Sequence, residues 1–438
     1  MKQIISWFLT IALLLLLAMP VAIAEDERTS GEFTYRIKGN GTAVITGYDW
    51  DRNQGEDIYI PRMIDGYTVT EIGSKAFAEL EYDDNYVIEF KQSNEAGRLV
   101  LSDTVTSIGD MAFMGIEFNA SSISIPSNVQ YIGKGAFSNS TGIKEFIVDS
   151  ANPNYASIDG ILYNKQQKSL VAYPLDYENN KLSILSIPEG ICSIEDYAFF
   201  GAGYDEYRRK NISIYFPSTV TSIGNYSFAR LGKKWTYING IESMKEMGTG
   251  AYYMAKLESL EFGDVTEIPP YAFFGVKYGN SYAKNLPSGL KSIGDYAFAR
   301  SDIYVDTVGS GGMFPASLES IGHYAFFKWV PSNANRLVRL DFTNSSIKTI
   351  GDFAFASAFV HPEIILPEGI EEIGTNAFVL SKPVDTVKLP SSLISLGESV
   401  FDMNTKLEVV SGTYGAMWAF DNGYVTVKEG GDDTSWLN

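Results

Sequence analysis

Apolar residues recur in one fixed pattern along most of this 438-residue chain. The pattern is Ile-Gly-x-x-Ala-Phe, and we count eleven copies, which end at Phe77, Phe113, Phe137, Phe199, Phe228, Phe273, Phe298, Phe326, Phe355, Phe378 and Phe401. The shortest step between copies is 23 residues, from Phe355 to Phe378. A sequence that repeats itself at this period indicates stacked structural units and not two or three ordinary domains.

A short strand that ends at proline precedes the motif in most copies. In one copy Val387 and Leu389 are two positions apart, so we expect both on the buried face of a strand that Pro390 ends. The chain then turns, and Leu393 and Leu396 point back inward. The glycine after Ile is expected to allow a tight or left-handed turn, and Phe to fill the interior. Because one repeat cannot bury its apolar side, the repeats must share a core.

The spacing is irregular in a way that predicts where loops emerge. Residues 147–180 hold a different unit, which we interpret as an extra repeat with a hairpin. Extra residues between Ala-Phe and the next strand fall at 78–97, 200–210, 229–256, 299–311 and 328–336. All of them start at the same repeat position, so we expect them along one edge, which is often the binding face of a repeat protein.

The two ends of the chain differ from the array. Lys2, the apolar run at residues 11–17 and Ala22-Ile23-Ala24 have the form of a secretory signal peptide. We therefore expect a protein that is secreted or at the cell surface, with no membrane insertion after cleavage. The expected divisions are a signal peptide at 1–24, an N-terminal β cap at 25–65, the repeat array at 66–401, a C-terminal cap at 402–428 and a flexible tail at 429–438.

Charge and cysteine content narrow the class of partner. The chain has 53 acidic and 34 basic residues, for a formal net charge of −19. This balance argues against nucleic acid, whose phosphates require a basic surface. Cys192 is the single cysteine, so no internal disulfide is possible, and we expect it to be a buried apolar filler.

Residues that could carry catalysis or bind a metal are sparse. The two histidines, His323 and His361, are too few for a metal cluster or a Ser-His-Asp triad. The acidic loop at residues 49–57 begins like a calcium loop, but Ile60 stands where the twelfth-position Glu is needed, so an acidic hairpin turn is the better interpretation. We therefore predict a non-enzymatic protein with no metal and no cofactor.

Aromatic residues are the one suggestive feature for binding, because Tyr and Trp dominate protein interfaces and stack on sugars. The alternative is that these rings fold back and cover the rim of the core. The candidate partner-binding residues are Tyr204, Tyr207, Tyr215, Trp235, Tyr237, Tyr252, Tyr253, Tyr278, Tyr282, Tyr304 and Trp329.

The full motif, Ile-Pro-x-x-Val/Leu-x-x-Ile-Gly-x-x-Ala-Phe, resembles the BspA-like leucine-rich repeat family over about residues 33–428. The segment 159–165 is also similar to a segment common in that family. The resemblance implies a right-handed, β-rich leucine-rich-repeat solenoid with caps, found in secreted and cell-surface proteins of bacteria, without catalytic residues. Glu195 and Pro269 replace the motif glycine and Val400 replaces its alanine, and we expect these changes to bend or loosen single repeats.

Several functions remain open at this point. The leading hypothesis is adhesion to a protein partner, a host matrix protein or another cell surface, through a concave sheet and the aromatic edge loops. The concave sheet is assigned to the strands that end at proline. The second hypothesis is a glycan-binding module, which a row of coplanar exposed Tyr or Trp would favour. A hydrolase site on the loops would require two carboxylates in a cleft, and a surface-layer protein would self-associate.

Overall fold

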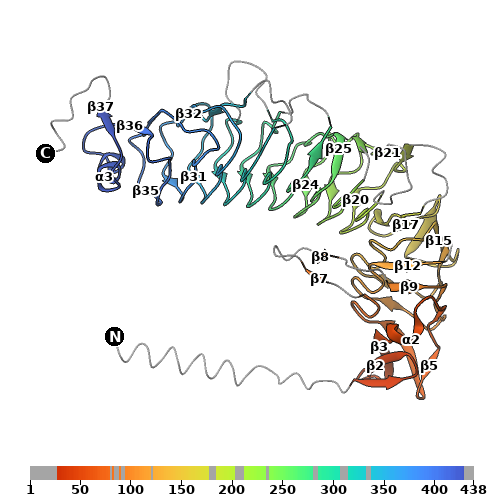
Figure 1. Cartoon of the computed structure of the whole chain (residues 1–438). Coiled ribbons are helices and arrows are strands. Elements are labelled where there is room, and N and C mark those ends of the chain that lie inside the picture. Colours follow the sequence, from red (N-terminus) through yellow and green to blue (C-terminus); the bar gives the residue numbers. More distant parts are fainter. Residues whose placement is uncertain are drawn as a thin grey trace, which may run out of the picture.

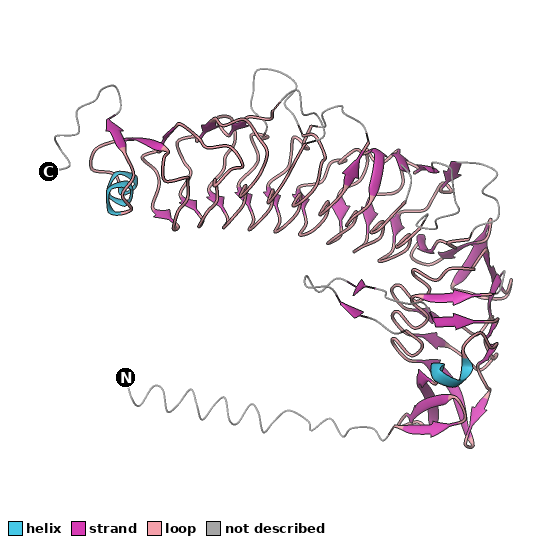
Figure 2. Ribbon diagram, viewed as in Figure 1, coloured by secondary structure: helices cyan, strands magenta, loops and turns pink. Residues whose placement is uncertain are grey.

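A computed structural model describes residues 27–78, 81–82, 88–89, 94–119, 122–176, 184–202, 212–232, 236–279, 285–305, 314–331 and 337–428. The chain winds into a solenoid of short strands joined by turns, which confirms the predicted leucine-rich-repeat architecture (Figures 1 and 2). A first arm carries the N-terminal strands and a second, longer arm carries the rest, and the two arms meet at a bend near β15 and β17. The predicted signal peptide and tail lie outside the described residues.

Strands that run antiparallel close the first arm. β1 (Arg28–Ser30) pairs with β2 (Phe33–Ile37), which pairs with β3 (Thr42–Tyr48), and β5 (Met63–Ile64) pairs with β6 (Tyr67–Ile72). β3 then runs parallel to β6, so the sheet passes directly into the repeats. A short hairpin, β7 (Glu81–Tyr82) and β8 (Ile88–Glu89), leaves the first arm after Phe77.

The inner sheet is a ladder of strands that mostly hold two residues each, the Ile or Leu of the motif and the residue before it. Its first part is β6, β11 (Ser107–Ile108) and β14 (Tyr131–Ile132). Its second part is β18 (Ser169–Ala172), β20 (Ser193–Ile194), β22 (Ser222–Ile223) and β24 (Glu246–Met247). Its third part is β26 (Glu267–Ile268), β28 (Ser292–Ile293), β29 (Ser320–Ile321), β31 (Thr349–Ile350), β33 (Glu372–Ile373) and β35 (Ser395–Leu396).

The outer strands run along the opposite side, and some of them hold the proline-terminated segments. In the first arm they are β4 (Ile58–Tyr59), β9 (Asn94–Ala96), β10 (Leu99–Val100), β12 (Ile116–Phe118), β13 (Ser122–Ile125) and β15 (Glu145–Val148). In the second arm they are β19 (Ile184–Ser186), β21 (Ile212–Tyr215), β23 (Thr236–Asn239), β25 (Lys256–Ser259), β27 (Lys277–Tyr278), β30 (Leu340–Asp341), β32 (Ile364–Ile365), β34 (Thr386–Lys388), β36 (Lys406–Val409) and β37 (Thr426–Lys428). Val387, Leu389, Leu393 and Leu396 are all buried, as the pattern predicted.

The predicted extra hairpin forms a wall between two hydrophobic cores. β16 (Tyr155–Ile158), β17 (Ile161–Asn164) and β18 are antiparallel neighbours. Ile161 and Tyr163 pack into the core of the second arm, whereas Leu162 and Val171 pack into the core of the first arm. A strand that is buried on both faces needs an unbroken apolar run, which is what the sequence of β17 supplies.

The motif rings stack face to face inside the solenoid, in one column per arm. In the second arm neighbouring ring centroids lie 4.9–5.7 Å apart, and the column runs from Tyr173 to Phe401. Tyr252 is a full member, 5.4 Å from both Phe228 and Phe273. The prediction that residues 229–256 form an insertion is therefore wrong. Their described residues form a complete turn of the solenoid, which we call a rung, with β23 and β24. The sequence hides this rung because Met247 and Tyr252 replace the Ile and Phe of the motif.

The motif glycine has a different role from the one predicted. It does not adopt positive φ; a β-carbon on Gly322 would lie 2.7 Å from the amide nitrogen of Asp295 on the preceding rung. Glycine is required because successive backbones approach too closely for a side chain. The left-handed residue is the one before Ala-Phe, as in Tyr296 with φ of 57° and Tyr324 with φ of 56°.

The two exceptions to the motif glycine have local explanations. At Glu195 the preceding element is the strand β18 and not a motif turn, and the Glu195 N–H makes the bond that motif glycines also make, here to Leu170 O (2.9 Å). Pro269 has no N–H, so it cannot make the bond that Gly294 makes to Ile268 O (2.8 Å). The inner sheet is interrupted there, and β24 and β26 belong to different sheets.

Tyrosine hydroxyls cover the last strand of the first and third parts of the inner sheet. The Ile132 N–H donates to Tyr155 Oη (2.7 Å), and the Leu396 N–H donates to Tyr414 Oη (3.4 Å). Tyr414 opens the helix α3 (Tyr414–Asp421), whose first turn is capped by the Thr413 hydroxyl. These contacts satisfy backbone donors that have no next strand to bond.

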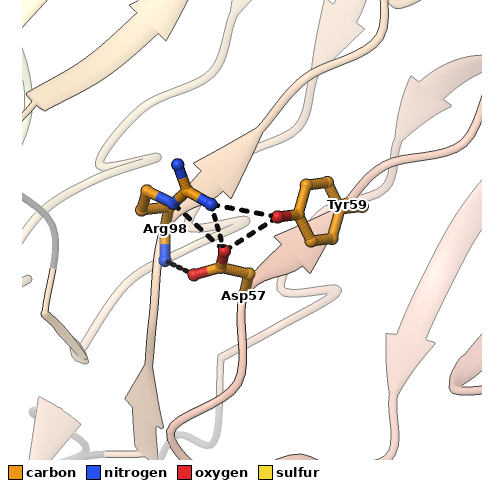
Figure 3. Close-up of polar contacts among 3 residues, drawn as sticks. All are labelled: Asp57, Tyr59 and Arg98. Atoms are coloured by element: carbon orange, nitrogen blue, oxygen red, sulfur yellow. Dashed lines mark hydrogen bonds and ion pairs between the residues drawn. The ribbon is translucent and has the colours of Figure 1, made fainter.

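The acidic loop contains the helical turn α2 (Trp50–Asn53). Its last acidic residue, Asp57, links two outer strands through hydrogen bonds. The Asp57 carboxylate accepts hydrogen bonds from the Arg98 backbone N–H (2.7 Å), from Arg98 Nη2 (2.7 Å) and from the Tyr59 hydroxyl (2.8 Å) (Figure 3). The Arg98 guanidinium, then the backbone N–H, hold the Asp57 pKa well below its usual range. The loop therefore joins β4 to β10 through Asp57.

Candidate binding surface

The inner sheet of the second arm has no partner element among the described residues, and it faces the inside of the bend. Figure 1 shows β20, β24, β31 and β35 along this side and β21, β25, β32 and β36 along the opposite side. The concave sheet is thus the two-residue ladder. Its assignment to the proline-terminated strands is corrected, because those strands lie on the convex side.

A groove of about 590 Å³ runs along the third part of the inner sheet, from Glu267 to Gly397. Its floor consists of the motif glycines and of the outward strand residues, which are small at Ser292, Ser320 and Thr349 and are glutamates at Glu267 and Glu372. The groove is hollow because the motif glycines cannot carry a β-carbon and most of the residues beside them are small.

One wall of the groove is a chain of side chains that accept hydrogen bonds from the next rung. Asp295 Oδ1 accepts from the His323 N–H (2.7 Å), and His323 Nδ1 accepts from the Asp352 N–H (3.0 Å). Asp352 Oδ1 continues the series with the Thr375 N–H (2.7 Å), and Thr375 Oγ1 with the Glu398 N–H (3.2 Å). The second oxygen of Asp352 lies 3.4 Å from His323 Nδ1, and Asp295 and Asp352 make this wall partly acidic.

Charged residues of both signs flank the other side of the floor. Lys291, Glu319, Lys348 and Glu371 precede the short strands of successive rungs. Lys348 Nζ lies 2.7 Å from Glu371 Oε1, and about half of each side chain is exposed. The groove therefore offers a ligand hydroxyls on its floor and ionic groups along both sides.

A ladder of half-buried rings follows the acidic wall in sequence. Tyr271, Tyr296, Tyr324 and Phe353 stack with centroids 4.8–4.9 Å apart and planes within 2–7°. Burial, then the neighbouring Tyr324 and Asp295, raises the pKa of Tyr296. Because each inner ring has both faces covered by its neighbours, the ladder presents edges and hydroxyls outward.

Most of the aromatic residues chosen from the sequence lie elsewhere. Tyr215 is 46% exposed and Tyr237 is half-buried, both on the convex sheet. Tyr204, Tyr207, Trp235 and Tyr282 lie outside the described residues. The other five are each 3% exposed or less, so the alternative that they cover the core is correct for them: Tyr252, Tyr253, Tyr278, Tyr304 and Trp329.

The reasons for this burial are visible at two of the five positions. Tyr252 occupies the place of the motif Phe. Trp329 fills the core beside Phe326, and its indole N–H donates to Ile303 O (3.0 Å). The residues that form the ring ladder were missed, although the sequence carries their signal, a Tyr or Phe two positions before the motif Phe.

A second hollow of about 380 Å³ lies over β20, β22 and β24. Here Lys134 of the first arm bonds Asp196 of the second (Nζ to Oδ2, 2.9 Å). Burial raises the pKa of the neighbouring Glu195 carboxyl, which accepts a hydrogen bond from the Ser169 hydroxyl. This hollow marks the junction between the two arms.

The described residues contain no group of three or more His, Cys, Asp or Glu that could hold a metal ion. Cys192 is half-exposed and not buried as expected; its Sγ lies 3.5 Å from Gly190 O. Within the part of the chain that is described, no helix is long and apolar enough to cross a bilayer.

Distant likenesses to solved structures accompany this geometry. A leucine-rich repeat protein from Eubacterium ventriosum is 19% identical, with 68% of this chain and 93% of that protein covered and a TM-score of 0.37. One from Bacteroides ovatus is 19% identical, with 92% and 99% covered and a TM-score of 0.30. A leucine rich cell surface protein from Faecalibacterium prausnitzii is 16% identical, with 86% and 96% covered and a TM-score of 0.29. At these values the likenesses carry no argument about function.

No curated protein matches the chain. The family described as BspA type leucine rich repeat region matches in six copies, over residues 56–159, 204–328 and 310–414. These residues make up more than half of the sequence, and they coincide with rungs that stack through the motif glycine and the motif ring. The chain therefore belongs to the BspA type leucine-rich repeat family.

Proposed function

We propose that this protein is a secreted or surface-associated binding protein, without enzymatic activity, that holds a segment of a protein partner in the concave groove. The observation that carries the proposal is the open face of the inner sheet, where the groove of about 590 Å³ extends from Glu267 to Gly397. Family membership and the form of the first 24 residues support a role outside the cell. The partner would be a host matrix protein or a protein of another cell surface.

The chemistry of the groove favours a polypeptide over a neutral sugar. Hydroxyls on the floor and ionic groups of both signs along the sides match the mixed donors, acceptors and charges of a protein surface. Neutral sugars bind aromatic side chains by stacking on a free ring face. The rings beside this groove are coplanar, but inside the ladder their faces are already occupied.

The test compares two pairs of serine or threonine to arginine substitutions at outward strand positions. Ser320→Arg with Thr349→Arg fills the groove, and Ser124→Arg with Ser186→Arg adds the same charge on exposed positions of the convex side. The purified protein and both variants are applied to paired arrays of extracellular-matrix proteins and glycans. We expect a protein ligand whose binding is lost only in the groove variant.

Three results would contradict the proposal. Equal loss in both variants would place binding elsewhere, and a neutral glycan ligand that is lost in the groove variant would replace the protein partner. Binding to neither array, together with self-association in solution that the groove variant abolishes, would assign the groove to a second copy of this chain.

A further inference from the structure

One lateral edge of the second arm carries a row of positive charges. We call the stretch that follows the stacked ring in each rung the turn edge. Five successive rungs each place one Lys or Arg there, and we call these five residues the cation row: Arg230, Lys256, Lys277, Arg300 and Lys328. Arg230, Arg300 and Lys328 lie in the turn two residues after the ring, whereas Lys256 and Lys277 lie two residues further along, as the first residues of β25 and β27. The rings of these rungs are 5.1–5.4 Å apart, so the row has a pitch of about one rung.

Aromatic rings hold two of these cations at the surface. Arg300 Cζ lies 5.8 Å from the centre of the Phe274 ring, and Lys328 Nζ lies 5.1 Å from the centre of the Phe327 ring. Both cationic side chains are nevertheless exposed. A cation over a ring keeps its full charge while its position becomes restricted, which suits recognition of an anion.

The backbone does not require these residues. Arg230, Arg300 and Lys328 have φ of 54°, 56° and 51°, in the left-handed region. Glycine occupies the same position in other rungs, as Gly201 with φ of 78° and Gly275 with φ of 63°. Because a β-carbon is sterically strained in this conformation, glycine would be the more stable choice for folding alone.

The cation row stands out against an acidic protein. The chain has 53 acidic and 34 basic residues, yet Arg230, Arg300 and Lys328 form no ion pair with any described residue. Lys277 lies 3.7 Å from Asp302, whose carboxylate also accepts the Tyr278 N–H (2.5 Å). At least three charges of the row are thus available to a ligand.

We propose that the cation row binds a linear anionic polysaccharide, one that carries sulfate or carboxylate groups along its length. One positive charge per rung, in one of two neighbouring positions, matches a chain that repeats an anionic sugar, because an extended sugar chain advances by about one rung per unit. The carboxylates on an acidic protein surface do not generally repeat at a regular interval of one rung. Arginine also binds sulfate and carboxylate through paired hydrogen bonds. This site is separate from the groove and does not depend on its partner.

The experiment uses the whole protein and three probes, which are heparin, uncharged dextran and poly-L-glutamate. The test variant is R230Q/R300Q/K328Q. The control variant is K245Q/K291Q/K348Q, which removes the same charge from exposed lysines that flank the inner sheet. Thermal unfolding checks that both variants fold. Binding is measured by titration at two salt concentrations, because counterion release makes polyanion binding salt-dependent.

We expect heparin to bind, dextran not to bind and poly-L-glutamate to bind at least tenfold more weakly than heparin. The test variant should lose heparin affinity by at least tenfold and show a weaker salt dependence, whereas the control variant should change by less than twofold. The proposal is overturned if heparin does not bind, if the control variant loses as much affinity as the test variant, or if poly-L-glutamate binds as tightly as heparin. The last result would make an acidic protein the ligand.

Discussion

At the scale of single residues, the motif glycine is a contact residue. The space beside Gly322 is closed by the backbone of the preceding rung, whereas a β-carbon on Gly289 would meet nothing within 4 Å. We expect Gly322→Ala to destabilise the protein by about 1–3 kcal/mol, because the two rungs must move apart. Gly289→Ala should be neutral or slightly stabilising, since it only restricts the unfolded chain. Urea unfolding of both variants measures the difference, and equal effects would refute the close-contact explanation.

Replacing Tyr by Phe should change stability in opposite directions at two buried tyrosines. Among the described residues Tyr252 Oη has no hydrogen-bond partner, whereas Tyr155 Oη accepts from the Ile132 N–H. Tyr252→Phe should leave stability unchanged or raise it by about 1 kcal/mol, because it removes an unsatisfied polar group. Tyr155→Phe should cost about 1–3 kcal/mol, because it leaves a buried amide unpaired. Denaturant titration of both variants measures the change in the free energy of unfolding. A loss of stability in Tyr252→Phe would show that the Tyr252 hydroxyl has a hydrogen-bond partner.

Glu195 makes stability depend on pH. Burial, and after it the neighbouring Asp196, raises the pKa of this carboxyl in the folded protein, although the Ser169 hydroxyl opposes the shift. The unfolded chain releases the proton at a lower pH, so Glu195 costs stability above its unfolded pKa and nothing below it. We expect Glu195→Gln to raise the melting temperature at pH 7 and to leave it unchanged near pH 3. A variant equal to the parent at both pH values would show that the carboxyl is solvated.

At the scale of the rung, two neighbouring rings with different burial should differ in their contribution. Phe298 is fully buried in the stacked column, and Tyr296 is half-buried in the ring ladder. Phe298→Ala should cost about 3–5 kcal/mol because it leaves a cavity. Tyr296→Gly loses ring contacts worth about 0.5–1.5 kcal/mol per pair, and relief of its left-handed backbone offsets part of that loss. Similar losses in chemical unfolding would mean that the outer ladder carries as much stability as the core.

Much of the rung was predictable from sequence, and the exceptions have physical causes. The alternation of Val387 and Leu389 and the burial of the motif Phe follow from period and chemistry. The complete rung at Tyr252 was missed because the pattern required Phe, whereas the structure requires only a buried ring at this position. The concave face could not be assigned from one repeat, because curvature arises when many rungs stack. Burial of Trp329 likewise depends on a neighbouring rung, where Ile303 O accepts its indole N–H.

At the scale of the whole molecule, the hairpin wall separates two cores that should respond independently. Phe113 belongs to the core of the first arm, where it stacks on Phe77 and Phe137. We expect Phe113→Ala to speed hydrogen exchange in residues 33–155 and to leave residues 212–424 unchanged, since each stack interacts with its nearest neighbours. Exchange measured by mass spectrometry on peptides from both arms is the test. Faster exchange in both arms would show that the wall transmits the loss.

The missing N–H of Pro269 has a mechanical consequence. The inner sheet lacks its strand pairing between β24 and β26, while the turns on the same rungs remain bonded, as in Tyr252 N–H to Ala272 O (2.8 Å), and the outer strands β25 and β27 remain paired. A solenoid under load flexes where its rigidity is lowest, and here only the concave side is weakened. Pulling on the two ends should therefore open the curve at this rung first and flatten the groove that begins at Glu267, so tension on the protein would change the shape of the proposed binding surface.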